Sequence, residues 1–287
     1  MFENIFKGFS FIKESFSLIA KDATLIKPSI YSIFVAIFFT IFSVIVLFLL
    51  QPVIPTGIFY ILVFLVLLGD YYISYFFTAM TAFLVYDFFK DGKATMSEAW
   101  EATKKNALTL FYLSIISAII YIITSVLRRR ERERGGVGGG ITDMILGFIE
   151  SVWTVATYFI IPAIVIEDRD IKGAVARAAD IMKKNLLPIG VGEIAVGFVT
   201  GILSFIGIIV AIVVGVMLFN AIGAVTGALV AILVAAVLII LIVALSMYIT
   251  TAYHTCLFLW ARDVEAAKIG APGTIKPPAP IANAMGV

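Results

Sequence analysis

The longest uncharged stretch of this chain runs from Ile194 to Ala261 and reads IAVGFVTGILSFIGIIVAIVVGVMLFNAIGAVTGALVAILVAAVLIILIVALSMYITTAYHTCLFLWA. Over these 68 residues no side chain is charged, apart from a proton that His254 could carry. An apolar run of about 18 residues is already typical of a membrane-spanning helix. The stretch therefore predicts two long spans, and it indicates a membrane protein.

The composition of the rest of the chain points the same way. Hydrophobic residues make up 62% of the 287 and charged residues only 14%, whereas a soluble domain carries about 25% charge. We therefore predict an all-α, polytopic membrane protein with six transmembrane helices. The expected spans cover about residues 28–50, 56–87, 107–128, 141–166, 187–217 and 224–260.

Proline, glycine and asparagine mark the turns between these spans. Pro52, Pro55 and Gly57 break the helix between the first two spans. In the last hairpin, Asn220 and Gly223 are the best markers, since both residue types favour turns. Three spans in this last part of the chain are an alternative. They would place the C-terminal charges on the opposite side from their counterparts earlier in the chain.

A repeat organises the six spans. Lys104-Lys105-Asn106 recurs 79 residues later as Lys183-Lys184-Asn185, and four further identities share this offset: Asp91 with Asp170, Lys93 with Lys172, Ala99 with Ala178, and Leu108 with Leu187. We predict three parallel repeats, at about 9–88, 94–167 and 173–261, each an interfacial helix followed by a hairpin. They form one transmembrane domain, 1–269, and a Pro-rich tail, 270–287, follows.

Each repeat opens with a short amphipathic stretch. Apolar and small residues recur there at spacings of three and four, as one face of a helix requires. The three sets are Ile12, Ser15, Phe16, Ile19 and Ala23; Met96, Ala99, Trp100, Thr103 and Ala107; and Val175, Ala178, Ala179, Met182 and Leu186. Such helices lie in the membrane interface. They either anchor the hairpins or form a collar, comprising Phe16, Trp100, Lys104, Lys105, Lys183 and Lys184, that controls access to a pathway.

Basic residues fix the expected orientation. With six spans, the side that holds both termini carries 16 of the 21 Lys and Arg residues. Because basic residues near span ends favour the cytoplasm, we expect both termini to be cytoplasmic and the protein to lie in the cell membrane. The remaining five basic residues, Arg128, Arg129, Arg130, Arg132 and Arg134, break this rule locally. No cleavable signal peptide is visible.

Three acidic residues fall inside the expected spans. They are Asp70, Glu150 and Glu193. A charge in the hydrocarbon costs at least about 2.5–3.5 kcal/mol, so such groups usually face water or a partner. We regard all three as candidate pathway or ion-binding residues. The alternative for each is a structural hydrogen bond between helices.

The arginine cluster continues the third span without a break. Spacings of three and four between its Arg and Glu residues support a helix that projects beyond the membrane, and the glycines of 135–140 form a linker after it. One interpretation is a solvated helix end. The other is a basic vestibule, in which copies of Arg128, Arg129, Arg130, Arg132 and Arg134 in a homo-oligomer would ring a mouth and attract anions.

Motifs of catalysis are missing from the sequence. His254 is the single histidine and Cys256 the single cysteine, so one chain cannot supply a His/Cys zinc site. No glycine-rich phosphate loop and no Gly-x-Ser-x-Gly elbow occurs. We predict no catalytic residue, no cofactor, no metal and no nucleic-acid partner. His254 is expected to be packed and hydrogen-bonded, and the tail is expected to be flexible or to bind a partner protein.

One segment carries a resemblance. Pro162-Ala-Ile-Val-Ile-Glu-Asp168, followed by Ala174, Ala178 and Lys183-Lys184-Asn185, resembles a signature of uncharacterised prokaryotic multi-pass membrane proteins. Those proteins are similar to the membrane domain attached to some glycerophosphodiester phosphodiesterases. The resemblance covers about residues 160–195 and implies a packing architecture. It implies no catalytic residues.

Three functions remain open from the sequence. The leading hypothesis is a homo-oligomeric channel or pore-like protein for small ions, with the lipid bilayer as its surroundings. The second is a non-transporting scaffold that binds lipid or a partner protein. The third is a secondary transporter in which Asp70 or Glu150 binds a coupling ion. A water-accessible axis would favour the pore, whereas a midplane pocket with an acid would favour the transporter.

Overall fold

The computed structural model describes residues 17–134, 139–184, 186–222 and 224–266, and every regular element in these ranges is a helix. The elements are η1 (Ala23–Ile26), α2 (Lys27–Leu50), α3 (Thr56–Asp91), α4 (Met96–Lys105), α5 (Ala107–Arg134), α6 (Gly139–Val165), α7 (Ile171–Lys184), α8 (Leu186–Ile222) and α9 (Ala224–Ala266). Six of them are long and apolar enough to cross a membrane. The all-α, six-span prediction is therefore confirmed.

The turns fall where the sequence predicts them. The first hairpin turns between Leu50 and Thr56, around its two prolines. The last part of the chain forms two long helices in the described ranges, α8 ending at Ile222 and α9 beginning at Ala224, so the three-span alternative is wrong. α5 continues to Arg134, as the spacing of its Arg and Glu residues predicts.

The order of the elements repeats along the chain. A short helix precedes two long ones in α4–α5–α6 and again in α7–α8–α9, and helical residues 17–21 precede α2 and α3. The exit from α3 shows how the chain passes from one repeat to the next. Gly92 has a φ of 72°, and its N–H donates to the Phe88 carbonyl at 2.9 Å. Glycine adopts this left-handed conformation without strain and so ends the helix.

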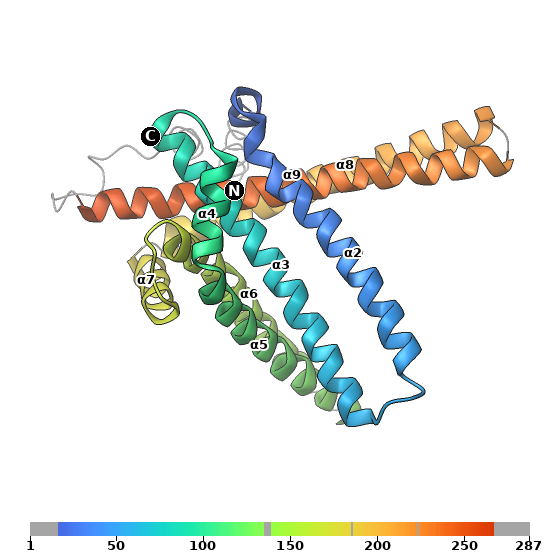
Figure 1. Cartoon of the computed structure of the whole chain (residues 1–287), viewed down its shortest axis with the longest axis horizontal. Helices are drawn as coiled ribbons and strands as arrows, with labels where there is room; N and C mark the ends of the chain where they lie inside the picture. The colour runs from blue at the N-terminus through green and yellow to red at the C-terminus, as the bar shows by residue number, and fades with distance from the viewer. Residues whose placement is uncertain (1–16, 135–138, 185, 223, 267–287) are drawn as a thin grey trace. The chain divides into compact units, whose positions relative to one another are not determined.

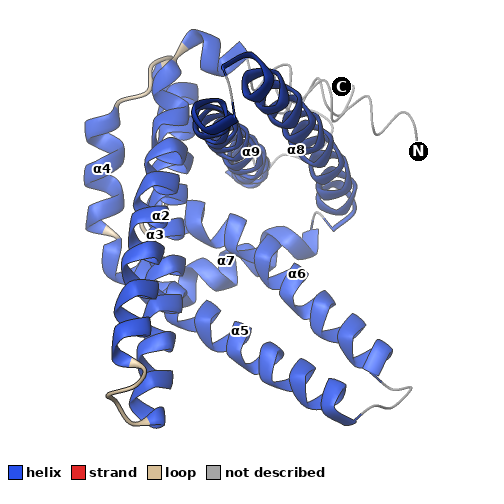
Figure 2. Cartoon of the chain, turned by 90° about the vertical axis from the view of Figure 1, so that its right-hand side faces the viewer, coloured by secondary structure: helices blue, strands red, loops and turns tan. Residues whose placement is uncertain are grey.

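The chain divides into two compact units, which we describe separately. Residues 34–83 and 96–183 form the unit that contains most of α2 and α3 together with α4, α5, α6 and nearly all of α7. Within it α5 and α6 pack side by side (Figure 2). The buried residues Leu110, Leu113 and Phe159 form part of its core. This unit holds nearly all the polar contacts between spans considered below.

The other unit comprises residues 1–33, 84–95 and 184–287, as far as they are described. Its main feature is the long contact between α8 and α9 (Figures 1 and 2). Gly207 of α8 faces Ile242 of α9 so closely that a Cβ there would collide with the isoleucine. Small residues let helix backbones approach in this way. η1 also packs on α9.

The buried faces of the two short helices were predicted with unequal success. In α4, Ala99 and Thr103 are buried as expected. In α7 the buried residues are Ala174, Ala178 and Ile181, whereas the sequence favoured Val175, Ala179 and Met182 beside Ala178. The face is thus turned by about one residue. Apolar residues occupy both stripes of this helix, and spacing alone could not choose between them.

A polar contact closes each repeat at the end where its short helix joins a span. Asp22, next to residues 17–21, accepts a hydrogen bond from the Ala94 N–H at 3.0 Å, after the first hairpin. Asn106 donates to Asp168 at 3.1 Å, after the second. Lys184 donates to Glu265 at 3.1 Å, after the third. Each short helix is therefore tied to the segment that leaves its own hairpin.

Candidate ion-binding site in the first hairpin

Asp70 lies well inside a helix that is predicted to span the membrane. It follows Thr56, the first residue of α3, by about 21 Å at 1.5 Å per residue, and a bilayer core is about 30 Å thick. Across the hairpin, the Thr40 hydroxyl of α2 donates to Asp70 Oδ1 at 3.2 Å. Within the described chain no cationic side chain pairs with this carboxyl group. Asp70 therefore has a neutral partner only.

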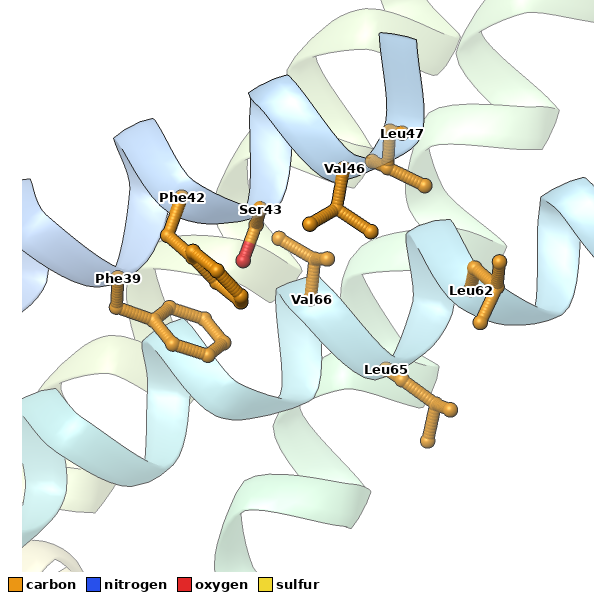
Figure 3. Close-up of a pocket in the computed structure, with 8 residues that line it drawn as sticks. All are labelled: Phe39, Phe42, Ser43, Val46, Leu47, Leu62, Leu65 and Val66. Atoms are coloured by element: carbon orange, nitrogen blue, oxygen red, sulfur yellow. The ribbon is translucent and has the colours of Figure 1, made fainter. Parts of the chain in front are cut away.

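An apolar slot lies between α2 and α3, within the same hairpin (Figure 3). It is an open groove with a volume of about 230 Å³, and Phe42 and Leu65 in its lining are exposed. Ser43 is the one polar residue of its lining, which consists of Phe39, Phe42, Ser43, Val46 and Leu47 of α2 and Leu62, Leu65 and Val66 of α3. The slot is therefore suited to an apolar group, and two aromatic rings belong to its wall.

Asp70 is not part of the slot lining but lies beside it. Val66 lines the slot and precedes Asp70 by four residues, which is about one helical turn of α3. Phe39 packs over Gly69, and a Cβ at that glycine would collide with the ring. This close approach brings the next residue of α2, Thr40, to Asp70. The arrangement is an apolar slot with a carboxyl group about one helical turn beyond its lining.

The second candidate acid, Glu150, has a charged partner instead. Arg128 Nη2 of α5 donates to Glu150 Oε2 of α6 at 2.9 Å, and Arg128 Nε lies 3.4 Å from Asp143 Oδ1. The side chains of Arg128 and Glu150 are 30% and 31% exposed, so solvent screens this pair only in part. The arginine joins the two helices, and its charge is balanced by carboxylates of its own chain.

A hydrogen-bonded trio lies deeper between the same helices. Ser117 Oγ accepts from Tyr75 of α3 at 2.8 Å and from Trp153 of α6 at 2.9 Å. Its own proton goes to the Leu113 carbonyl at 3.0 Å. A hydroxyl offers one donor and two acceptor positions, so all three are used. Ser117 and Tyr75 are buried, and the trio links α3, α5 and α6.

Ion pairs at the helix ends involve the segment that carries the family resemblance. Glu167 accepts from Arg177 at 3.2 Å, and both side chains are nearly buried. Asp168 accepts from Lys105 and from Asn106. These two hydrogen bonds lower the pKa of Asp168, because they favour its charged form. Asp168 has a φ of 55°, which Asp adopts more readily than most residues.

The pKa of Asp22, at the first repeat junction, is lowered in the same way as that of Asp168. Partial burial raises the pKa of its carboxyl group, but hydrogen bonds from the backbone of Ala94 and of Thr24 outweigh this, so the pKa lies below its usual value. The carboxylate also caps η1 through the Thr24 N–H at 2.8 Å. Each of the three repeat junctions is thus stabilised by one polar contact of a charged side chain, which belongs to Asp22, Lys105 or Lys184.

Not every residue of the sequence hypotheses can be placed. Phe16 lies outside the described residues, and the side chains of Glu193, Arg132 and Arg134 lie outside the described part as well. The other predicted residues are described: Arg129 and Arg130 on α5, Trp100 and Lys104 on α4, and Lys183 on α7. Trp100 is 45% exposed and packs edge-on against Phe76, with ring centroids 5.3 Å apart.

His254 and Cys256 take no part in a described site. His254 is 1% exposed, and its Nδ1 lies 2.7 Å from the Thr250 carbonyl. The expectation of a packed, hydrogen-bonded histidine is confirmed. Cys256 is buried and free. In the described ranges no group of three or more His, Cys, Asp or Glu side chains could hold a metal ion.

Sequence reasoning missed several residues of these contacts. Asp143 lies seven residues before Glu150 and shares its helix face, so spacing could have found it. Thr40 and Asp70 lie at similar distances from the turn at 51–55, and an antiparallel hairpin brings such residues together. Nothing in the sequence pairs Ser117 with both Tyr75 and Trp153.

These elements define the class of protein. It is a multi-pass α-helical membrane protein with six long apolar helices in the described ranges. The chain belongs to a family of unknown function, DUF6159, whose model matches residues 53–268. No curated protein sequence matches it.

Proposed function

We propose that this protein is a secondary transporter of the antiport type, in which Asp70 binds a proton and a cation in turn. One observation carries the proposal: Asp70 lies inside the span, one helical turn beyond the slot residue Val66, with only the Thr40 hydroxyl as its described partner. The cytoplasmic placement of both termini, assembly as a homo-oligomer and the absence of catalysis are part of the same proposal.

The charge of Asp70 supports this function. An ionised carboxylate at this depth costs at least about 2.5–3.5 kcal/mol on insertion scales. A proton or a bound cation removes most of that cost, whereas a neutral hydroxyl removes little of it. Because one carboxyl group can hold one of the two at a time, proton and cation compete. Competition at a single site couples their movements in opposite directions when the occupied site opens to the two sides of the membrane in turn.

The arginine cluster supports the pore hypothesis less well. An anion-attracting vestibule requires arginines whose charge is not neutralised nearby. Arg128, its first member, is paired with Glu150 and lies beside Asp143. Substrate sites of secondary transporters lie near the middle of the bilayer. At 1.5 Å per residue Val66 lies about 15 Å along α3 from Thr56, which is half the thickness of a bilayer core of about 30 Å. The geometry therefore favours a transporter over an open pore.

Proton movement in vesicles tests the proposal. Purified protein is reconstituted into liposomes that contain the pH dye pyranine, and NaCl, KCl or benzyltrimethylammonium chloride is added outside. We expect at least one of these cations to raise the internal pH, since cation entry drives proton exit. Asp70→Asn should abolish the response.

The matched control is Asp143→Asn. It removes another carboxyl group from a span of the same unit but leaves the slot and Asp70 unchanged, so the pH response should persist. An Asp70→Asn variant that exchanges protons as fast as the wild type would contradict the proposal. Currents that do not saturate and move no protons would favour the pore.

A further inference from the structure

We propose that the slot between α2 and α3 binds a lipophilic organic cation, with its apolar body in the slot and its cationic group at Asp70. This inference rests on the proposed function in one respect, which is that it takes Asp70 as the cation site. It goes beyond that function because it names the chemical class of the substrate.

The lining of the slot selects the apolar body. Seven of its eight residues are apolar, and its volume of about 230 Å³ has room for a group the size of an aromatic ring or a short alkyl chain. An alkali ion would find a single side-chain oxygen along such a wall, the Ser43 hydroxyl, which is too few to replace its hydration shell. A lipophilic molecule, in contrast, is already concentrated in the hydrocarbon around the hairpin.

The acid beside the slot selects the sign of the charge. Asp70 would repel an anionic head group and attract a cationic one. Thr40 completes this site with a hydroxyl. The rings of Phe39 and Phe42 lie close together in the wall of the slot (Figure 3), and Phe39 directly precedes Thr40. Aromatic faces attract quaternary ammonium groups. The apolar wall, the two aromatic rings and an acid with no cationic partner among the described residues together favour a lipophilic cation. They disfavour a phospholipid with a phosphate head group.

Binding of benzyltrimethylammonium to the full chain in lipid nanodiscs tests the inference directly. Isothermal titration calorimetry, corrected with empty nanodiscs, should show saturable binding of this cation. Two comparison ligands separate the contributions. Tetramethylammonium has the charge without the aromatic body, and phenylmethanesulfonate has the body with the opposite charge. Both should bind at least tenfold more weakly.

Three variants locate the site. Asp70→Asn removes the charge, whereas Val66→Trp fills the middle of the slot and Leu62→Trp fills one end of it. Each should weaken binding at least tenfold while the protein elutes as the wild type does in gel filtration. The control Ile41→Trp adds the same side chain to an exposed position of α2 outside the slot lining, so it should bind as the wild type does.

The outcomes also separate this inference from the proposed function. If benzyltrimethylammonium does not bind, or binds equally to wild type, Asp70→Asn and both slot-filling variants, the inference is wrong. Sodium-driven proton exchange in vesicles would then still support the transporter. Equal binding of phenylmethanesulfonate would also overturn the inference, because it would indicate a slot for any apolar chain.

Discussion

The hairpins α5–α6 and α8–α9 occupy the same place in successive repeats but are held together differently. Polar side chains join α5 to α6, through Arg128 with Glu150 and through Ser117 with Trp153. α8 and α9 meet through small residues, with Gly207 against Ile242 and Gly215 beside Ala231. The two hairpins therefore share the order of their helices but differ in the contacts that hold the two helices together.

The first hairpin has neither charge pairs nor close glycine packing over much of its length. Between α2 and α3 the Phe39–Gly69 contact and the Thr40–Asp70 hydrogen bond lie at one end of the slot. A hairpin that is neither tightly packed nor charge-paired leaves room for a ligand. This difference is why we place the substrate there, and the predictions below test it from the largest expected effect to the smallest.

The tight packing of α8 on α9 predicts the largest effect on stability. Gly207→Leu forces a branched side chain against Ile242 and should lower the free energy of unfolding by about 3 kcal/mol, the upper end of the usual range for overpacking. Gly201→Leu is the control, because a Cβ there meets no atom within 4 Å. Thermal unfolding in detergent measures both. Equal melting temperatures would show that α8 and α9 do not meet at Gly207.

The hydrogen-bonded trio predicts the next effect. Ser117→Ala leaves the Tyr75 hydroxyl and the Trp153 N–H without their acceptor, which should cost about 1–3 kcal/mol. Ser114→Ala is closely matched, because Ser114 is also buried and donates to the carbonyl four residues earlier in α5. It should cost clearly less. A Ser114 variant as unstable as the Ser117 variant would contradict the trio.

The ion pair between α5 and α6 predicts a smaller loss. Arg128→Gln leaves Glu150 and Asp143 without their cation, so the melting temperature should fall further than in Arg130→Gln, which removes an exposed arginine. Exchange of the charges in Arg128→Glu with Glu150→Arg should restore part of the loss. The pairing would be refuted if the double variant were no more stable than Arg128→Glu alone.

The smallest expected effect on stability is at the junction of the second repeat, where Asp168 lies. This effect depends on pH. The pKa of Asp168 is lowered in the folded protein from its ordinary value of 3.8. Its stabilising contribution is therefore present above that value and is lost as the pH falls through the lower, folded pKa.

Asp168→Asn keeps a residue that tolerates the positive φ but removes the charge. The melting temperature of this variant should lie slightly below that of the wild type near neutral pH, and the difference should vanish as the pH falls below the pKa of Asp168. A difference that is independent of pH would contradict the assigned hydrogen bonds from Lys105 and Asn106.

The sequence predicted the helices well, but it predicted few of the side-chain contacts between helices. Apolar runs and turn residues predicted all six long helices, because membrane spans depend on composition. The charge pattern predicted that α5 would continue to Arg134. Partners across a hairpin depend on how the helices rotate and how closely they approach. The Thr40–Asp70 contact, for example, depends on Phe39 fitting over Gly69. The resemblance to the phosphodiesterase membrane domains stays a prediction.

Proton release from the purified protein tests the central claim most directly, since that claim is competition of a proton and a cation for Asp70. In weakly buffered detergent solution, a pH electrode counts the protons released when benzyltrimethylammonium or sodium chloride is added. We predict that one of these salts releases protons from the wild type in a saturable manner, approaching one per chain. Asp70→Asn should release none, whereas Asp143→Asn should match the wild type. Equal release from wild type and Asp70→Asn, or none from the wild type with either salt, would contradict the account.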